Sequence, residues 1–208
     1  MNPISTQRIQ SLDVLKGLVM IVMALDHTRD YFHSAAFLFE PTDPENTTSA
    51  IYFTRWITHY CAPAFSLLAG ISAFLVGRRK SKMELSGFLF KRGIWLMFIE
   101  LTVVNFSWFF DIHFSFFGMM VIWSLGISMI LLAALIHLPR RAILVFSLAM
   151  IFGHNLLDSI HFDGNILWAI IHEMQSFQYG DVKVMVAYPI IPWVGVMSLG
   201  YYVGAYYN

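Results

Sequence analysis

Residues 11–30 read SLDVLKGLVMIVMALDHTRD, an apolar stretch with charged residues at both ends. Lys16 and His27 lie eleven positions apart, which in a helix places them within roughly 20° of one face and about 16 Å apart along the axis. Asp26 and Asp30 flank the histidine, and a carboxylate beside an imidazole fixes its tautomer and raises its basicity. The pattern predicts a helix with one polar stripe that ends in a candidate general base.

The composition of the chain indicates an integral membrane protein. Its 208 residues are 58% hydrophobic and 16% aromatic but only 12% charged, whereas a soluble domain is about 25% charged. The formal net charge is zero, so no overall field attracts nucleic acid. The single cysteine, Cys61, can form neither an internal disulfide nor a thiolate metal cluster. We therefore expect the lipid bilayer as a partner and no nucleic acid.

Six stretches of the chain are apolar and long enough to cross a bilayer, whose hydrocarbon core of about 30 Å takes about 20 helical residues. Residues 158–183 are expected to lie at the membrane interface. The predicted spans are Leu12–Phe32, Trp56–Gly77, Phe88–Phe110, Phe116–Ile136, Ala142–Ile160 and Val184–Tyr207. We therefore predict an all-α, polytopic bundle of six transmembrane helices that forms a single domain over residues 1–208.

The distribution of basic residues predicts the orientation of this bundle, because Lys and Arg collect in cytoplasmic loops. With a cytoplasmic N-terminus, only Arg29, Arg55 and Lys183 fall on the outer side. The inner loops and inner helix ends then carry Arg8, Lys16, Arg78, Arg79, Lys80, Lys82, Lys91, Arg92, Arg140 and Arg141. The sequence thus predicts an N-terminus in the cytoplasm.

Ionisable side chains inside the predicted spans are candidates for function, because they are costly in lipid unless they face a cavity or a partner. Glu100 falls near the middle of the third span, where it needs a proton or a cation such as Arg55 or a histidine. Arg55 and His59 lie four residues apart, on one helical face. His154 and Asn155 add a polar cluster at the outer end of the fifth span. Each group has a structural alternative, which is a buried ion pair or a place among the lipid headgroups.

Four groups of residues occur in an order that resembles one family. They are SLDVLKG with MALDHTRD (11–17 and 23–30), FTRWIT with APAF (53–58 and 62–65), KRGIWL with Glu100 (91–96), and YPIIPWVG (188–195). Together they resemble the bacterial relatives of heparan-alpha-glucosaminide N-acetyltransferase over nearly the whole chain. The wider membrane acyltransferase superfamily is similar in having a basic residue and a histidine at the spacing of Lys16 and His27, although that basic residue is typically Arg. The proteins it resembles carry several more membrane helices, so this chain would be a C-terminally truncated form.

The resemblance implies transfer of an acyl group, expected to be acetyl, from acetyl-CoA to a sugar or another amine or hydroxyl acceptor. The acceptor would lie on the extracytoplasmic side of a bacterial inner membrane. His27 would deprotonate the acceptor or carry the acyl group, Asp26 or Asp30 would orient its ring, and Glu100 would relay a proton. Substrate or CoA contacts would come from Lys16, Arg29, Arg55, His59, Arg92, His154 and Asn155.

No bound cofactor and no metal are expected, and acetyl-CoA is a co-substrate. Histidines on several helices could hold a haem or a metal ion, but spacing alone is a weak signal for such a site. The basic run from Arg78 to Arg92 could meet the phosphates of CoA, although the topology of the membrane by itself requires such a loop. The oligomeric state, the acceptor and the choice between a covalent acyl-histidine and direct transfer stay open.

Two other functions would account for the same charges. A proton-coupled transporter would use Asp26, His27, Glu100 and His154 as a relay across the membrane. A non-catalytic membrane subunit would only pair these charges structurally. Uptake that depends on a pH gradient, without consumption of an acyl donor, distinguishes the transporter from the enzyme.

Overall fold

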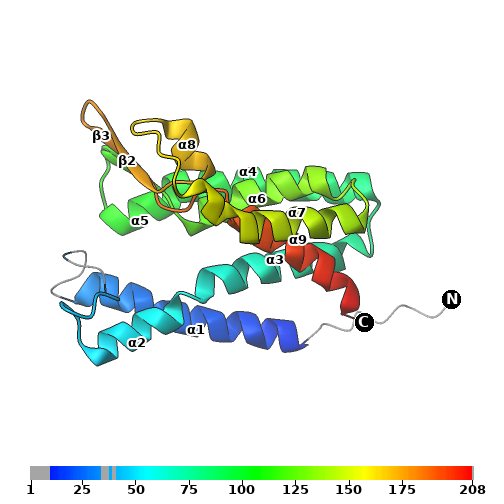
Figure 1. The fold of residues 1–208 in the computed structure, drawn as a ribbon, viewed down its shortest axis with the longest axis horizontal. Coiled ribbons are helices and arrows are strands. Elements are labelled where there is room, and N and C mark those ends of the chain that lie inside the picture. Colours follow the sequence, from blue (N-terminus) through cyan, green and yellow to red (C-terminus); the bar gives the residue numbers. More distant parts are fainter. Residues whose placement is uncertain (1–9, 34–37, 39–40, 208) are drawn as a thin grey trace. The chain divides into compact units, whose positions relative to one another are not determined.

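A computed structural model describes residues 10–33, 38 and 41–207, and two compact units divide the chain at Leu68 and Ala69 (Figure 1). Each unit is described by itself. The first contains the helices α1 (Gln10–Phe32) and α2 (Ser49–Thr58), and α3 (Cys61–Gly77) leads from the first unit into the second. Within the first unit α1 packs against α2, and the Cys61 thiol donates a hydrogen bond to the carbonyl oxygen of Val19 at 3.7 Å.

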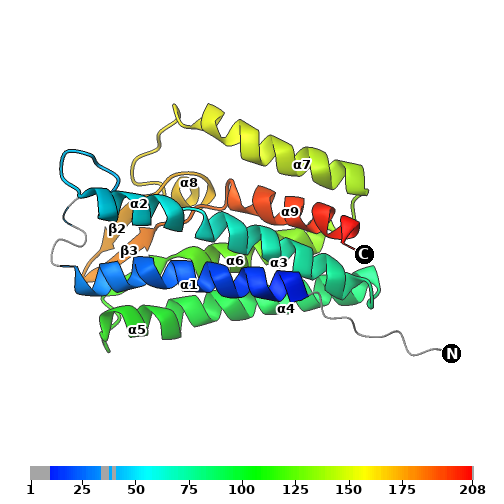
Figure 2. The same cartoon turned by 90° about the horizontal axis from the view of Figure 1, so that it is seen from below.

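The second unit is built on four longer helices that pack in pairs. They are α4 (Lys82–Ile99), α6 (Val121–Leu135), α7 (Arg140–Gly153) and α9 (Trp193–Val203). Helix α6 packs against α4 and α9, and α7 lies beside α9 (Figure 2). The pair α4 and α6 approaches closely at Gly93 and Gly126, because a Cβ on Gly93 would come within 2.5 Å of the Gly126 carbonyl oxygen. A core of apolar side chains, with Leu89 and Leu132 fully buried, fills the space between these helices.

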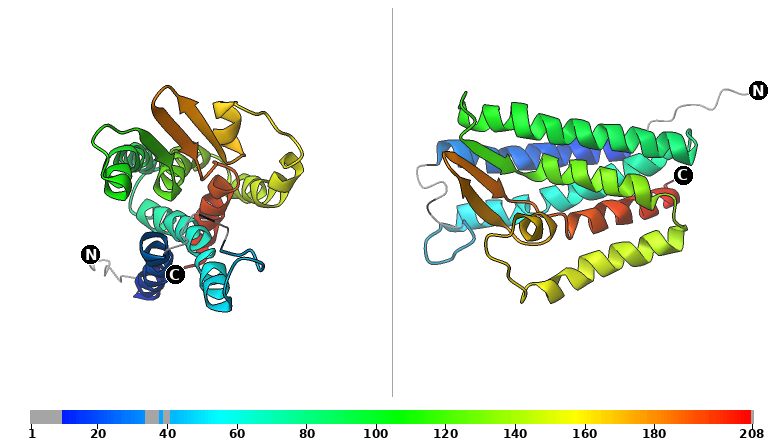
Figure 3. Two further views of the ribbon diagram at one scale, coloured as in Figure 1. Left: turned by 90° about the vertical axis from the view of Figure 1, so that its left-hand side faces the viewer. Right: turned by 90° about the horizontal axis from the view of Figure 1, so that it is seen from above.

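A three-stranded sheet stands at one end of the second unit (Figure 3). Helix α4 continues through a π-helical turn (Glu100–Val104) into α5 (Asn105–Phe109), and the strand β1 (Phe116–Met119) follows. The hairpin of β2 (Gln175–Tyr179) and β3 (Val182–Val186) pairs with β1 through β3, which runs parallel to it. Two 3₁₀ turns (His154–Leu157 and Gly204–Tyr206) extend α7 and α9, and the short helix α8 (Ile166–Ile171) contacts β2.

The sheet corrects the prediction of an all-α fold. The apolar run Val184–Tyr207 is not one helix, because its first residues belong to β3 and α9 begins only at Trp193. The run Phe116–Ile136 likewise begins as β1 and becomes helical at Val121. Short runs of Val, Met and Phe are compatible with both a buried strand and a buried helix, so hydropathy alone does not distinguish the two.

Two helical stretches in the described part of the chain are long and apolar enough to cross a membrane. They are Ser49–Gly77, which runs from the start of α2 to the end of α3, and Arg140–Leu157, which is α7 with its 3₁₀ turn. Only 11% of the apolar window of Arg140–Leu157 is buried within the protein, whereas a helix in the core of a soluble protein is mostly buried. This exposure is compatible with insertion into lipid. The six-span bundle is not confirmed, and its orientation stays a prediction. Arg8, which contributed to that orientation, lies outside the described residues.

The close approach of α4 to α6 predicts that Gly93→Ala destabilises the protein. The added Cβ would meet backbone that cannot move without separating the helices, and overpacking of this kind costs about 1–3 kcal/mol. Gly87→Ala on the same helix is the matched control, because nothing lies within 4 Å of its Cβ position and Ala favours the helix. Thermal unfolding of the purified variants measures both effects. A Gly93→Ala variant as stable as the wild type would contradict the packing described here.

The turn between α5 and β1 predicts a local pH dependence centred on Asp111. Its carboxylate accepts hydrogen bonds from the Ser115 hydroxyl, the Ser115 N–H (2.7 Å) and the His113 N–H (2.8 Å). These bonds, the Ser115 hydroxyl foremost, lower the pKa of Asp111. They hold a turn in which Phe110 and Phe114 have φ values of 49° and 51°.

A carboxyl group with a lowered pKa in the folded state stabilises the fold above its unfolded pKa of about 3.9. This contribution disappears as the pH falls through the folded value. Asp111→Ala should therefore reduce the amide-exchange protection of His113 and Ser115 at pH 7. The difference from the wild type should shrink as the pH falls below the unfolded value and through the lowered folded value. Equal protection of both proteins at pH 7 would show that Asp111 does not hold the turn.

Candidate functional site

Asp26 is the centre of a charged network that joins α1 to α2. Its Oδ1 accepts hydrogen bonds from Arg29 Nη1 (2.7 Å) and Thr58 Oγ1 (2.8 Å), and its Oδ2 accepts one from Arg55 Nη1 (2.6 Å). Arg29 also donates from Nη2 to Asp30 Oδ1 at 2.8 Å. The four charged side chains are only 14–27% exposed, and their two positive and two negative charges cancel.

The spacing of these residues explains why the network forms. Asp26 and Arg29 lie one turn apart on α1, and Arg55 and Thr58 lie one turn apart on α2, so each pair occupies one helical face. Helix α2 begins at Ser49 because the Thr48 side chain accepts the N–H of Ile51. The two faces meet where α1 packs on α2. The contact between them therefore includes two charge-assisted hydrogen bonds, from Arg55 and Thr58 to Asp26.

The remaining predicted residues of the first unit are Lys16, His27 and His59. Lys16 and His27 are half-buried on α1, and each has an interaction partner. His59 is exposed, and its Nδ1 lies 2.7 Å from the Arg55 carbonyl oxygen. The Nε atom of Arg55 is buried and has no hydrogen-bond partner among the residues that the structure describes, which leaves a donor for another group. An orienting contact of Asp26 or Asp30 with the His27 ring stays a prediction.

Glu100 lies in the second unit, at the start of the π-helical turn. Its side chain is 1% exposed, and Oε2 accepts the N–H of Trp123 at 3.0 Å, while Oε1 has no hydrogen-bond partner among the described residues. Trp123 lies in the first turn of α6, whose N-cap residue Met120 provides no side-chain cap. Glu100 therefore caps α6 from a neighbouring helix, where the helix dipole favours a carboxylate. Arg55, the cation expected for Glu100, binds Asp26 instead.

Asn105 is a residue that the sequence argument missed. Its Nδ2 donates to the carbonyl oxygens of Glu100 (2.6 Å) and Gly118 (3.1 Å), and its Oδ1 accepts the Gly118 N–H at 2.6 Å. The side chain is buried and fixes β1 against the π-helical turn. A π-helical turn in an α-helix often marks a functional site. Asn105 and Thr58 both carry a signal that could have found them, because each is a polar residue inside a predicted span.

The other predicted site residues are also in the second unit. Arg92 lies on α4 with an exposed side chain. His154 begins the 3₁₀ turn after α7, and its Nδ1 lies 2.7 Å from the carbonyl oxygen of Ile151. Asn155 follows it and is exposed. Within residues 10–33, 38 and 41–207, no group of three or more His, Cys, Asp or Glu side chains is placed to hold a metal ion.

Ionisable side chains paired within apolar helices are typical of functional membrane proteins. The family model described as heparan-alpha-glucosaminide N-acetyltransferase, catalytic, matches residues 8–208. The chain therefore belongs to the heparan-alpha-glucosaminide N-acetyltransferase family, which is a family of membrane acetyltransferases. No curated protein and no solved structure matches the chain. The resemblance found in the sequence is thus confirmed at the level of the family.

The network predicts strong coupling between Asp26 and Arg55. Asp26→Asn removes the charge that both arginines face, and Arg55→Gln removes one of those arginines, so either variant leaves the half-buried network with one unbalanced charge. We expect the double variant to be more stable than the sum of the single changes predicts, with a coupling energy of about 1–3 kcal/mol. Equilibrium unfolding of the wild type, the two single variants and the double variant measures this coupling energy. Additive effects would show that the pair contributes no coupling.

Proposed function

We propose that the protein transfers an acetyl group from acetyl-CoA to an amine or hydroxyl acceptor, such as an amino sugar, on the extracytoplasmic side of a bacterial inner membrane. Membership of the acetyltransferase family supports the reaction class. Among the structural observations, the network around Asp26 carries the proposal. It fixes the end of α1 that contains His27 against α2, and a catalytic base must be held in place to act.

Asp26 acts in this proposal as a positioning residue. Its carboxylate is occupied by Arg29, Arg55 and Thr58, so it sets the rotation and depth of α1. Asp30 lies three residues after His27 on the same side of the helix and is the carboxylate that orients the imidazole.

The direct reaction needs one base. His27 takes a proton from the acceptor amine or hydroxyl as the acceptor nitrogen or oxygen attacks the thioester carbonyl carbon. A carbon–nitrogen or carbon–oxygen bond forms, the carbon–sulfur bond breaks, and the proton passes from His27 to the CoA thiolate. In the covalent alternative, an imidazole nitrogen of His27 attacks the thioester carbonyl carbon, the carbon–sulfur bond breaks, and the leaving CoA thiolate takes the N–H proton of the imidazole. The acceptor then attacks the acetyl carbon, the carbon–nitrogen bond to His27 breaks, and the acceptor proton passes to the imidazole.

The cations and polar residues have binding roles in this proposal. The Nε of Arg55 is a donor available to a carbonyl oxygen, because it is buried and has no partner within residues 10–33, 38 and 41–207. Lys16 lies on the same helical face as His27, toward the opposite end of α1, and would meet the donor. Arg29, His59, Arg92, His154 and Asn155 are proposed as further contacts to substrate or CoA, and Glu100 as a proton relay.

The proposal predicts that His27→Ala loses most of the transfer activity. Positioned proton transfer contributes about 10²- to 10⁴-fold in rate, so we expect kcat to fall by that factor. Transfer of radiolabelled acetyl from acetyl-CoA to a panel of amino sugars, with protein in proteoliposomes, measures it. His113→Ala is the matched control, because His113 is an exposed histidine in the turn before β1. Undiminished transfer by the His27→Ala variant would overturn the assignment.

The same preparation distinguishes the two routes. With acetyl-CoA and no acceptor, a covalent route releases about one equivalent of free CoA per protein in a rapid burst. Direct transfer releases none beyond background hydrolysis. Uptake driven by a pH gradient without consumption of acetyl-CoA would instead favour the transporter and contradict the proposed function.

A further inference from the structure

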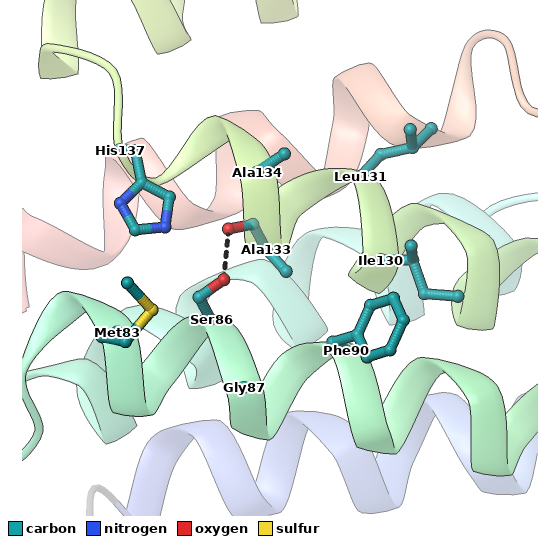
Figure 4. A pocket seen from close by; sticks show the side chains of 9 residues that line it. All are labelled: Met83, Ser86, Gly87, Phe90, Ile130, Leu131, Ala133, Ala134 and His137. Carbon is teal, nitrogen blue, oxygen red and sulfur yellow. Dashed lines mark hydrogen bonds between the residues drawn. The ribbon is translucent and has the colours of Figure 1, made fainter.

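An apolar groove of about 630 Å³ runs along the surface between α4 and α6 (Figure 4). Small residues form its floor, and the Ser86 hydroxyl donates to the Ala133 carbonyl oxygen at 2.8 Å across it. Larger apolar side chains form its walls, with His137 at one end. The lining residues are Met83, Ser86, Gly87, Phe90, Ile130, Leu131, Ala133, Ala134 and His137. The groove therefore fits a narrow apolar object with a polar group at one end.

The two walls of the groove end in basic turns. Helix α4 emerges from the segment Arg78–Lys82, in which three consecutive cations precede Ser81 and Lys82, and all five side chains are exposed. Helix α6 ends beside His137, and the exposed Arg140 and Arg141 open α7. These two turns lie at the same end of the second unit (Figure 3). The only acid of the segment 78–92 is Glu84, which the Ser81 side chain and N–H bind.

Contacts fix the guanidinium of Arg140 in place at this end. It lies 5.9 Å from the centroid of Phe74, 5.5 Å from that of Tyr202 and 5.9 Å from that of Tyr206. Arg78 donates to the carbonyl oxygen of Tyr207 at 3.3 Å. A guanidinium whose faces stack on aromatic rings can still donate its N–H groups to an anion. Two of these N–H groups can bind the oxygens of one phosphate together. The end of the groove is thus both positively charged and ordered.

An exposed apolar strip continues along α4 beyond the groove. Phe90, Ile94, Trp95 and Phe98 are each 48–59% exposed. From Met83 to Phe98 the helix rises about 22 Å, which exceeds the depth of about 15 Å of one bilayer leaflet. The apolar surface is therefore long enough to accompany a lipid chain from the headgroup to the middle of a membrane.

We propose that this groove binds one anionic phospholipid, with an acyl chain along α4 and α6 and the phosphate on the basic turns. The charge of the turns selects an anionic headgroup, because each Lys or Arg near a membrane surface attracts anionic lipid. The apolar walls select a lipid over a soluble phosphate such as that of CoA. The site is separate from the network around Asp26, and it would hold whether or not the proposed acetyl transfer is correct.

Native mass spectrometry of the protein, released from nanodiscs of equal phosphatidylglycerol and phosphatidylcholine, tests the proposal. We expect the wild type to retain phosphatidylglycerol in preference to phosphatidylcholine. Gly87→Phe fills the groove, where nothing lies within 4 Å of a Cβ, and should reduce retained phosphatidylglycerol about tenfold. Ala134→Phe, on α6, should also fill the groove and reduce retained phosphatidylglycerol. Gly153→Phe is the matched control, because the Cβ position of Gly153 at the end of α7 is equally open.

A second pair of variants tests the headgroup. The double variant Lys80→Gln and Lys82→Gln should lose roughly tenfold to thirtyfold in preference for phosphatidylglycerol, whereas Lys183→Gln on β3 should lose none. Free glycerol phosphate at millimolar concentration should not displace the lipid, because it has no chain for the groove.

Three results would overturn the proposal. Unchanged retention by the Gly87→Phe and Ala134→Phe variants would show that the groove binds no lipid chain. Displacement by glycerol phosphate or by acetyl-CoA would show that the turns form a soluble-phosphate site. A dimer that the groove variants dissociate, without any change in retained lipid, would assign the groove to a second copy of the chain.

Discussion

A polar group inside an apolar helical protein must find its partners within the protein, because its surroundings offer none. This constraint organises both units. In the first, Asp26 draws Arg29, Arg55 and Thr58 together and so determines how α1 packs on α2. In the second, Glu100 accepts a hydrogen bond from the N–H of Trp123, one of the N–H groups at the start of α6 that have no partner within the helix. Each helix pair is thus aligned by a carboxylate, and the apolar side chains then fill the space between them.

In the proposed function, the same constraint separates residues that hold the helices in place from residues that react. Asp26 binds two arginines and a hydroxyl, so in the proposed reaction it holds α1 in place. The proposal gives the chemistry to His27, which is the next residue along the helix. Glu100 differs from Asp26 because one of its oxygens is buried and has no hydrogen-bond partner in the described part of the chain.

Hydropathy predicted the helical parts of the fold well and the sheet not at all. The span Leu12–Phe32 is α1 to within two residues, and Phe88–Phe110 ends one residue beyond the continuous helix from α4 to α5. The run Val184–Tyr207 failed because β3 and α9 are both apolar, and the six residues between them, 187–192, are apolar apart from Pro189, Pro192 and the hydroxyl of Tyr188. Its β3 residues form a strand because β1 and β2 supply hydrogen-bond partners on both sides, and no local pattern contains that information.

The sequence by itself determined the apolar character of the chain, the family to which it belongs and the stripe of polar residues on α1. These depend on composition, motif order and helical spacing, which are local properties. Only the tertiary structure decided which charges meet. Asp26 rather than Glu100 binds Arg55, and the π-helical turn places Asn105 against β1. Small residues on α4 and α6 leave a groove that ends near the basic turns. Each of these pairs residues that are far apart in the chain, and such pairing follows from how the helices pack.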